Sequence, residues 1–239
     1  VWIWSAAAGR RWGTAAQWTI VPEPQAVRLP DRASLELGAS LGVPALTAHR
    51  CLFADGDVAG RNVLVAGGAG AVGHFAIEIA KHRGARVATT VSTEAKAELA
   101  RAAGADLVVN YREPDAREQL RSFAARMDRI VEVNLAANLA LDLALAGPET
   151  VIAAYAIDGP DPVLPVRACM SANVVLRFVL LYGVPRPALD RAVAEVSAAL
   201  EAGALSELPI HRFPLDQCAA AHDAVQSGVV GKVVLDISA

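Results

Sequence analysis

Glycine is concentrated in one short segment, where its spacing suits phosphate binding. Gly68, Gly70 and Gly73 form the pattern GxGxxG, directly after a predicted strand over residues 62–66 and before a predicted helix over 74–83. Glycine at these positions permits a tight turn, a close approach of the backbone to a pyrophosphate and close packing of the helix on the strand. Free N–H groups at the start of the helix would then point at the phosphates. This context predicts dinucleotide binding rather than a purely structural glycine turn.

The end of the second predicted strand, over residues 86–91, indicates which dinucleotide is bound. Sites that prefer NAD carry an acidic residue here, which binds the ribose 2′-hydroxyl. In this chain the strand ends in Ser92 and Thr93, and the nearby Glu94 opens the next helix, where the helix dipole also favours an acid. Lys96 could pair with a 2′-phosphate and Ser92 could hydrogen-bond it. We therefore expect NADPH, although the spacing alone is equally compatible with a solvated Lys96.

Other residue types that often do chemistry are scattered along the chain. The three cysteines, Cys51, Cys169 and Cys218, form neither a disulfide framework nor a CxxC metal pair, so we expect inert thiols rather than a nucleophile. The five histidines do not form a metal-ligand set, and we place His74 and His82 on the surface or edge of a helix. The sequence assigns no catalytic acid or base.

The elements that position the glycine loop alternate between short β-branched runs and helical patterns from residue 61 to 180. This alternation is typical of βαβ units on a parallel sheet, and a complete dinucleotide-binding domain has six such strands. The helix over 74–83 has an apolar face with Phe75 and Ile79 and an opposite, polar face with Glu78 and His82. The predicted strands span 62–66, 86–91, 106–110, 129–134, 150–155 and 173–180, and the predicted helices span 74–83, 94–103, 138–146 and 187–202.

Both ends of the chain have a different pattern. Residues 1–30 contain strand-like pieces, at 1–4 and 15–21 among others, without an intervening helix, so we expect antiparallel strands there. Strand-like segments at 208–213 and 232–237 flank a short helical stretch. We therefore predict an α/β protein in which a Rossmann doubly wound six-stranded parallel sheet is inserted in a smaller, β-rich domain built from both termini.

The composition excludes several classes of protein. The 239 residues include 22 Lys+Arg and 25 Asp+Glu, a net charge of −3, with no basic run, which argues against a nucleic-acid partner. A hydrophobic content of 54% excludes disorder. No apolar run approaches the roughly 20 residues of a membrane helix and no signal sequence opens the chain, so we expect a cytoplasmic protein. The chain lacks an initiator Met and begins in an apolar run, as if inside a domain.

Five segments carry a family resemblance. They are residues 41–48, 63–73, 92–96, 104–112 and 231–234, in this order along the chain. In these segments the sequence resembles the zinc-free quinone oxidoreductases, the zeta-crystallin-like group of the medium-chain dehydrogenase/reductase superfamily, and the resemblance covers essentially all of the chain. It implies a Rossmann domain over residues 41–206 and a partial GroES-like catalytic domain over 1–40 and 207–239.

The resemblance also implies which residues contact the cofactor. Those at the 2′-phosphate of NADPH are Ser92, Lys96 and Tyr111, those at the pyrophosphate are Gly70, Ala71 and Val72, and those near the nicotinamide half are Thr47, Asn134, Tyr155 and Phe178. For Tyr155 and Phe178 an ordinary core position is equally compatible. Val43 occupies the position where zinc-bearing relatives have a ligand cysteine, so we expect no bound zinc.

The function that the resemblance implies is an NADPH-dependent, zinc-independent reductase that transfers hydride to a quinone or another conjugated carbonyl. Alternatives are an enoyl-thioester reductase, which the same cofactor geometry would serve, and a catalytically idle NADPH-binding or interaction protein. In the family, most polar residues that face the substrate lie in a stretch upstream of the position that corresponds to Val1. We therefore expect these 239 residues to bind NADPH but to reduce quinones poorly without an upstream stretch. The apolar edge strand at 173–180 predicts a homodimer, because relatives pair this strand across a two-fold axis.

Overall fold

The structure, a computed structural model, describes residues 1–237, and the chain divides into two compact units. Unit 2 comprises Thr47–Leu181, and unit 1 comprises Val1–Leu46 together with the chain from Tyr182 onward. The domain boundaries expected from the sequence, at residues 40 and 206, differ from these because the segments 41–46 and 182–206 group with the two ends of the chain. The GroES-like character of the terminal segments stays a prediction.

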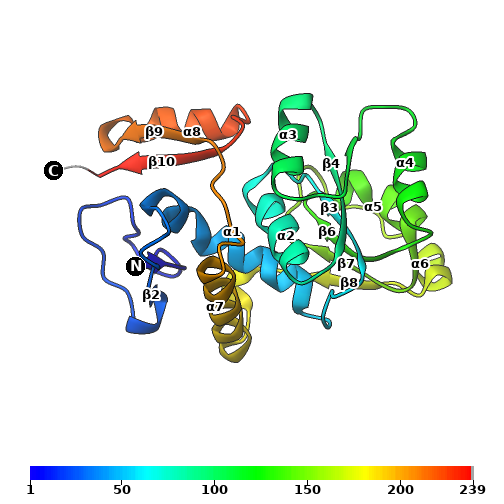
Figure 1. Ribbon diagram of the computed structural model, residues 1–239, viewed down its shortest axis with the longest axis horizontal. Coiled ribbons are helices and arrows are strands. Elements are labelled where there is room, and N and C mark those ends of the chain that lie inside the picture. Colours follow the sequence, from blue (N-terminus) through cyan, green and yellow to red (C-terminus); the bar gives the residue numbers. More distant parts are fainter. Residues whose placement is uncertain (238–239) are drawn as a thin grey trace. The chain divides into compact units, whose positions relative to one another are not determined.

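Unit 2 is built on a six-stranded sheet in which all neighbouring strands are parallel (Figure 1). The order β5-β4-β3-β6-β7-β8, renumbered along this sheet, is the 3-2-1-4-5-6 order of the Rossmann fold. The predicted α/β fold with a doubly wound parallel sheet is therefore confirmed. The strands are β3 (Asn62–Ala66), β4 (Arg86–Val91), β5 (Leu107–Asn110), β6 (Met127–Glu132), β7 (Ala146–Ala154) and β8 (Val175–Phe178).

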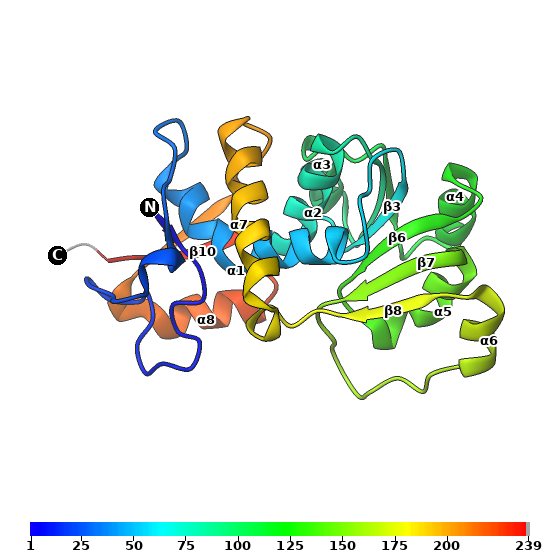
Figure 2. The ribbon, with the colours of Figure 1, turned by 90° about the horizontal axis from the view of Figure 1, so that it is seen from below.

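Helices cover both faces of this sheet, as right-handed crossovers in both directions from β3 require (Figures 1 and 2). One face carries α2 (Ala71–His82) and α3 (Glu94–Ala102), and the other carries α4 (Ala116–Phe123), α5 (Leu135–Leu145) and α6 (Val166–Ala172). Between the sheet and the second group lies an apolar core, in which Leu64, Ile130 and Ile152 from the strands meet Leu120 and Leu139 from the helices. This core fixes the carboxyl ends of the strands along one edge of the sheet.

Several predicted details of unit 2 are wrong. Glu78 and His74 were expected on exposed positions of α2, yet only 6% and 2% of their surfaces are exposed. They lie one turn apart with Nε2 of His74 3.2 Å from Oε1 of Glu78, and this pairing permits both to be buried. Strand β7 begins at Ala146 instead of residue 150, with a register shift opposite Met127. The edge strand β8 is shorter than the predicted 173–180, because Asn173 adopts a left-handed turn just before it.

Unit 1 contains two small sheets. Strands β1 (Trp2–Ile3) and β2 (Ala26–Val27) pair antiparallel, whereas β9 (Ile210–Pro214) and β10 (Lys232–Asp236) pair parallel, with α8 (Cys218–Gln226) as their crossover. The unit also contains α7 (Arg186–Glu201) and the short 3-10 helices η1 (Glu23–Gln25), η2 (Leu181–Gly183, which begins at the last residue of unit 2) and η3 (Leu215–Gln217). The strand predicted at residues 15–21 does not form. Its apolar side chains find no neighbouring strand, and Trp18 and Ile20 are 89% and 91% exposed.

A 19-residue helix, α1 (Leu35–Phe53), runs across the boundary between the units and was not predicted. It contains Pro44, which removes one backbone hydrogen bond and usually ends a helix. Gly42 lets β1 approach this helix, since a Cβ there would lie 2.6 Å from the carbonyl oxygen of Ile3. Within residues 1–237, none of the helices has the length and apolar character needed to cross a bilayer.

Candidate functional site

The glycine loop lies between β3 and α2 and is held against the end of β4. The N–H groups of Gly67 and Gly68 donate to the carbonyl of Thr90, at 3.1 and 3.2 Å, and that of Gly70 donates to the carbonyl of Gly67 at 2.9 Å. Gly67 has a φ of 72°, a left-handed conformation that favours glycine. These bonds fix a tight turn at the carboxyl edge of the sheet, beside the point where the strand order reverses.

The amino terminus of α2 is left open for a ligand. Gly70 is its N-cap and has no side chain to cap the helix. The first intrahelical bond runs from the N–H of His74 to the carbonyl of Gly70, at 2.8 Å. Helix geometry therefore leaves the N–H groups of Ala71, Val72 and Gly73 without intrahelical partners. A pyrophosphate is a group that such an end can bind, by hydrogen bonds and by the helix dipole.

Two glycines of the motif lie where no side chain fits. A Cβ on Gly68 would lie 2.7 Å from Cδ1 of Ile77 and 3.0 Å from Cβ of Thr89. A Cβ on Gly73 would lie 2.9 Å from two backbone carbons of the loop. Gly70, in contrast, is exposed, and a Cβ there would meet only the carbonyl of Gly67 at 3.3 Å. The loop is thus packed tightly from behind and open in front, as the predicted pyrophosphate site requires.

The three residues expected at the 2′-phosphate lie at the ends of neighbouring strands. Nζ of Lys96, in the first turn of α3, is 3.3 Å from Oγ of Ser92, which follows β4. Thr93 caps α3 through a bond from the N–H of Lys96 at 3.4 Å. The N–H of Tyr111, which follows β5, donates to the carbonyl of Val91 at 3.0 Å, and the Tyr111 side chain is 53% exposed. Ser92, Lys96 and Tyr111 therefore lie at one end of the carboxyl edge.

The acidic residue between Ser92 and Lys96 in the sequence is engaged elsewhere. Glu94 forms an ion pair with Arg101 on the outer surface of α3, where both side chains are more than half exposed. The end of β4 thus presents a hydroxyl and an ammonium group, which are hydrogen-bond donors to an anion.

Three of the four residues expected near the nicotinamide, Asn134, Tyr155 and Phe178, lie toward the other end of the same edge. Asn134 follows β6, and its Oδ1 accepts the N–H groups of Ala137 and Asp158, so it is also the N-cap of α5. Tyr155 follows β7, where burial raises the pKa of its hydroxyl. Phe178 ends the edge strand β8 and is 71% exposed, whereas Thr47 on α1 is 6% exposed. Their roles toward a cofactor stay predictions.

Sequence reasoning missed four polar residues beneath this edge. The carbonyl of Thr90 accepts hydrogen bonds from the N–H groups of the glycine loop, and Oγ1 of Thr89 donates to the carbonyl of Val65 at 2.7 Å. Glu132 and Asp142 lie buried behind the turn that follows β6. Signals for them exist in the sequence: two threonines within an apolar strand, and a single charged residue in the largely apolar helix 135–145.

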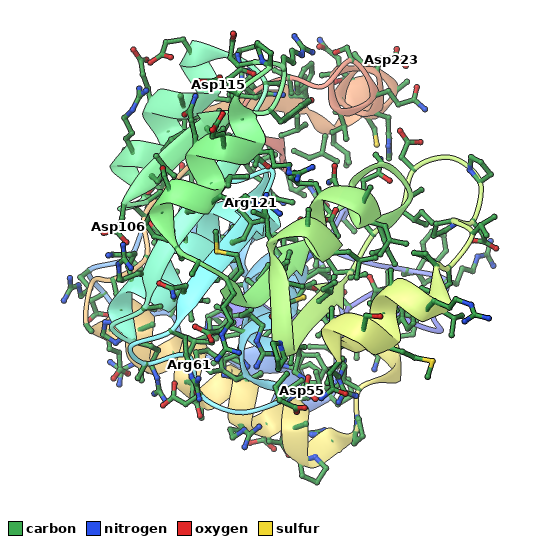
Figure 3. The ribbon with its side chains drawn as sticks, turned by 90° about the vertical axis from the view of Figure 1, so that its right-hand side faces the viewer. Asp55, Arg61, Asp106, Asp115, Arg121 and Asp223 are labelled. Atoms are coloured by element: carbon green, nitrogen blue, oxygen red, sulfur yellow. The ribbon has the colours of Figure 1, made fainter. Side chains whose placement is uncertain are left out.

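A pocket of about 470 Å³ lies at the opposite, amino-terminal edge of the sheet, and its lining includes Asp55 and Arg61, both labelled in Figure 3. Its charged groups bind one another. Arg177 holds Asp55 through two nitrogens, which lowers the pKa of Asp55, and the buried Arg129 lies 3.6 Å from the same carboxylate. This ion-pair network fastens the segment after α1 to β6 and β8.

Metal ligands and thiols were expected to play no part. Val43 lies on α1, and within the described 237 residues no three His, Cys, Asp or Glu side chains gather as a metal site would need. Cys51 is buried and burial raises its pKa to about 12, so its thiol stays protonated, in agreement with the predicted inert character.

Comparison with known proteins identifies the family. The sequence model described as zinc-binding dehydrogenase matches residues 71–198, more than half of the chain. The chain belongs to this family. It is 28% identical to human quinone oxidoreductase over 228 residues, which cover 93% of this chain and 69% of that protein. This homology and the Rossmann sheet place the chain in the medium-chain dehydrogenase/reductase superfamily, as the resemblance implied.

Solved structures of this family share the fold. An NAD-dependent alcohol dehydrogenase superposes with a TM-score of 0.86 at 27% identity, covering 96% of this chain and 66% of its own. A mycobacterial protein complexed with NADPH superposes with a TM-score of 0.80 at 30% identity, covering 90% of this chain and 70% of its own. The chain thus spans about two thirds of the length of the proteins it matches, and its neighbours include users of both nicotinamide cofactors.

Proposed function

We propose that this chain is the dinucleotide-binding part of an NADPH-dependent reductase that transfers hydride to a quinone or another conjugated carbonyl. One observation carries the choice of cofactor: the Ser92–Lys96 pair follows β4 next to the glycine loop, and the neighbouring Glu94 is paired with Arg101. A 2′-phosphate would be bound by the ammonium of Lys96 and the hydroxyl of Ser92, whereas a ribose 2′-hydroxyl would lack its usual acidic acceptor.

The residues present fit such a cofactor along the whole edge of the sheet. The open N–H groups of Ala71, Val72 and Gly73 would hold the pyrophosphate, and Tyr111 would lie beside the adenosine half. Asn134 and Tyr155 would line the nicotinamide half. The cofactor supplies a hydride from its nicotinamide ring, so the protein has to bind, orient and shield it from water. The proposed quinone-type acceptor follows from the homology to quinone oxidoreductase.

Cofactor preference tests the proposal through titrations of the wild-type chain with NADPH and NADH. We expect Lys96→Ala to lose roughly 1.5–3 kcal/mol of NADPH affinity, about 10- to 100-fold, the usual value of a hydrogen bond to a charged group. The affinity for NADH should not change. Arg101→Ala is the matched control, since it removes a positive charge from the same helix at a site paired with Glu94. Equal dissociation constants for both cofactors, or no loss in the Lys96 variant, would refute the assignment.

Hydride transfer is tested separately, by following the absorbance of NADPH with 1,2-naphthoquinone as acceptor. A reductase oxidises NADPH only when both the protein and the acceptor are present. If NADPH binds but no conjugated acceptor is reduced, either by this chain or by a version extended upstream, the chain is a binding protein and the proposed activity is wrong.

We further propose that the protein is cytoplasmic and that two copies pair through the edge strand β8. The strand leaves one row of backbone N–H and C=O groups without a neighbouring strand in the described sheet. Two apolar side chains at its end, Phe178 and Leu180, are 71% and 69% exposed. Pairing with a second copy would satisfy the backbone groups and cover this apolar surface.

A further inference from the structure

Two carboxyl groups with no part in the proposed function lie buried behind the turn between β6 and α5. Glu132 ends β6 and is 0% exposed, and Asp142 lies on α5 and is 1% exposed. Asp142 is the one charged residue of that helix. Burying a single carboxylate is already unfavourable, so two adjacent ones require a specific arrangement of protons and donors.

The contacts of the pair indicate that it shares one proton. Oε1 of Glu132 accepts the backbone N–H of Asn134 and Nδ2 of Asn138, the latter at 2.9 Å. Oε2 of Glu132 and Oδ2 of Asp142 are both buried, and apart from a proton that the two carboxyl groups share, no N–H or O–H group within residues 1–237 donates to either. The two side chains nevertheless hydrogen-bond to each other. Two carboxylates are acceptors only, so one of them must keep its proton.

That proton belongs on Asp142. Burial raises the pKa of Glu132, but hydrogen bonds from N–H groups of Asn134, Asn138 and Val133 act in the opposite direction and stabilise its anion. Burial, and after it the charge of Glu132, raise the pKa of Asp142 to about 9. The neighbouring titratable groups are Tyr155 after β7 and, facing Tyr155, Cys51 on α1; burial raises the pKa of both, so both are neutral at neutral pH. Arg129, earlier in β6, is directed to the carbonyls of Cys51 and Asp55.

The turn held by this pair forms part of the crevice. A Cβ on Gly67 would lie 3.3 Å from Cγ1 of Val133, so the turn packs directly on the glycine loop. On its other side, Oδ1 of Asn134 accepts the N–H of Asp158, in the segment after β7. Because β3 and β6 are the two strands between which the order reverses, this turn and the glycine loop are the opposing walls of the expected ligand site.

We propose that Glu132 and Asp142 are a proton-sharing pair that positions the β6–α5 turn as the wall opposite the glycine loop, and that losing the shared proton loosens this wall. The proposal rests on the proposed function only for the identity of the ligand. Glu132 and Asp142 are positioning residues, because they act through the backbone of Val133 and Asn134.

The pair predicts a loss of cofactor affinity at alkaline pH. For an acid whose pKa is raised in the folded state, the stabilising contribution is present below its unfolded pKa, near 3.8, and is lost as the pH rises toward about 9. Above that pH two buried negative charges repel each other, and the hydrogen bond between them disappears. We expect the dissociation constant for NADPH to rise roughly two- to thirtyfold, the range for residues that act on a ligand through a supporting network.

The test measures the NADPH dissociation constant from neutral pH to above pH 9, together with the unfolding temperature, for the wild type and three variants. Asp142→Asn keeps the shape and donates to Glu132 at every pH, so its affinity should stay constant while that of the wild type falls. Asp142→Ala leaves Glu132 without its partner and should bind weakly throughout. Asp161→Asn, at an exposed position, is the matched control and should follow the wild type.

An alkaline loss of affinity in Asp142→Asn as large as in the wild type would overturn the proposal, as would wild-type affinity in Asp142→Ala. If the wild type binds no NADPH at any pH, the proposed function is wrong. The unfolding temperatures then decide whether the pair exists, because Asp142→Asn must lose less stability than the wild type as the pH rises through about 9. Equal losses would refute the shared proton itself.

Discussion

Replacing Gly73 with alanine would insert one methyl group where the glycine loop and α2 touch. The added carbon would lie 2.9 Å from C of Gly67 and from Cα of Gly68, and closer still to the carbonyl oxygen of Gly67. Carbon atoms in contact normally lie about 3.5–4.0 Å apart. The obstructing atoms belong to the backbone, so the loop or the helix must shift. Overpacking costs about 1–3 kcal/mol, and a rigid obstacle places this variant near the upper value.

Gly70→Ala is the matched comparison, because it adds the same methyl group on the open side of the loop. Its nearest obstacle, the carbonyl of Gly67 at 3.3 Å, can yield slightly, so the fold should persist. The methyl group would instead occupy space that the pyrophosphate needs, and we expect NADPH affinity to fall by at least about tenfold, or 1.4 kcal/mol. Gly183→Ala, with no atom within 4 Å of the new carbon, should change neither property.

Thermal unfolding and NADPH titration distinguish the two effects. A loss of about 3 kcal/mol should lower the unfolding temperature of Gly73→Ala by roughly 6–12 °C in a chain of this size. Gly70→Ala should unfold near the wild-type temperature and bind NADPH poorly. If Gly73→Ala is as stable as the wild type, the packing argument is wrong. If Gly70→Ala binds NADPH with wild-type affinity, the loop does not hold the pyrophosphate.

Three further predictions concern stability, metal and assembly. Asp55→Asn should lower the free energy of unfolding in urea by about 3 kcal/mol, because it leaves the buried Arg129 without its carboxylate. Since Arg177 lowers the pKa of Asp55, this stabilisation should be present above pH 3.8 and be lost as the pH falls below it. An unchanged unfolding midpoint would contradict the network. Protein prepared without chelator should contain far less than one zinc per chain by metal analysis, and stoichiometric zinc would show that Val43 does not mark the loss of a site. Light scattering at micromolar concentration should give the mass of a dimer, and a monomeric mass would exclude pairing through β8.

Most of the sheet in unit 2 could be predicted because its sequence signals are local. Strands β3 and β4 match their predicted bounds, since each is a short β-branched run followed directly by a loop or turn and a helix. The errors occur where tertiary contacts override local preference. Helix α1 was not predicted because Pro44 usually ends a helix. The surrounding packing maintains the helix despite one missing hydrogen bond. Residues 15–21 have the composition of a strand but no neighbouring strand with which to pair.

The candidate site shows the same division. The glycine loop, Ser92 and Lys96 could be found from type and spacing, because a phosphate-binding turn needs glycine and a helix start at fixed positions. The partnership of Glu132 and Asp142 could not, since residues ten positions apart meet only when α5 folds back on β6. The burial of His74 and Glu78 was missed for a related reason: their mutual pairing, and not their individual polarity, decides where they lie.

A crystal structure of this chain with NADPH tests the central claim most directly. The account predicts the pyrophosphate at the N–H groups of Ala71, Val72 and Gly73. It also predicts the 2′-phosphate within hydrogen-bond distance of both Nζ of Lys96 and Oγ of Ser92. A dinucleotide bound elsewhere, or one whose 2′-phosphate lies in solvent away from these two groups, would contradict it.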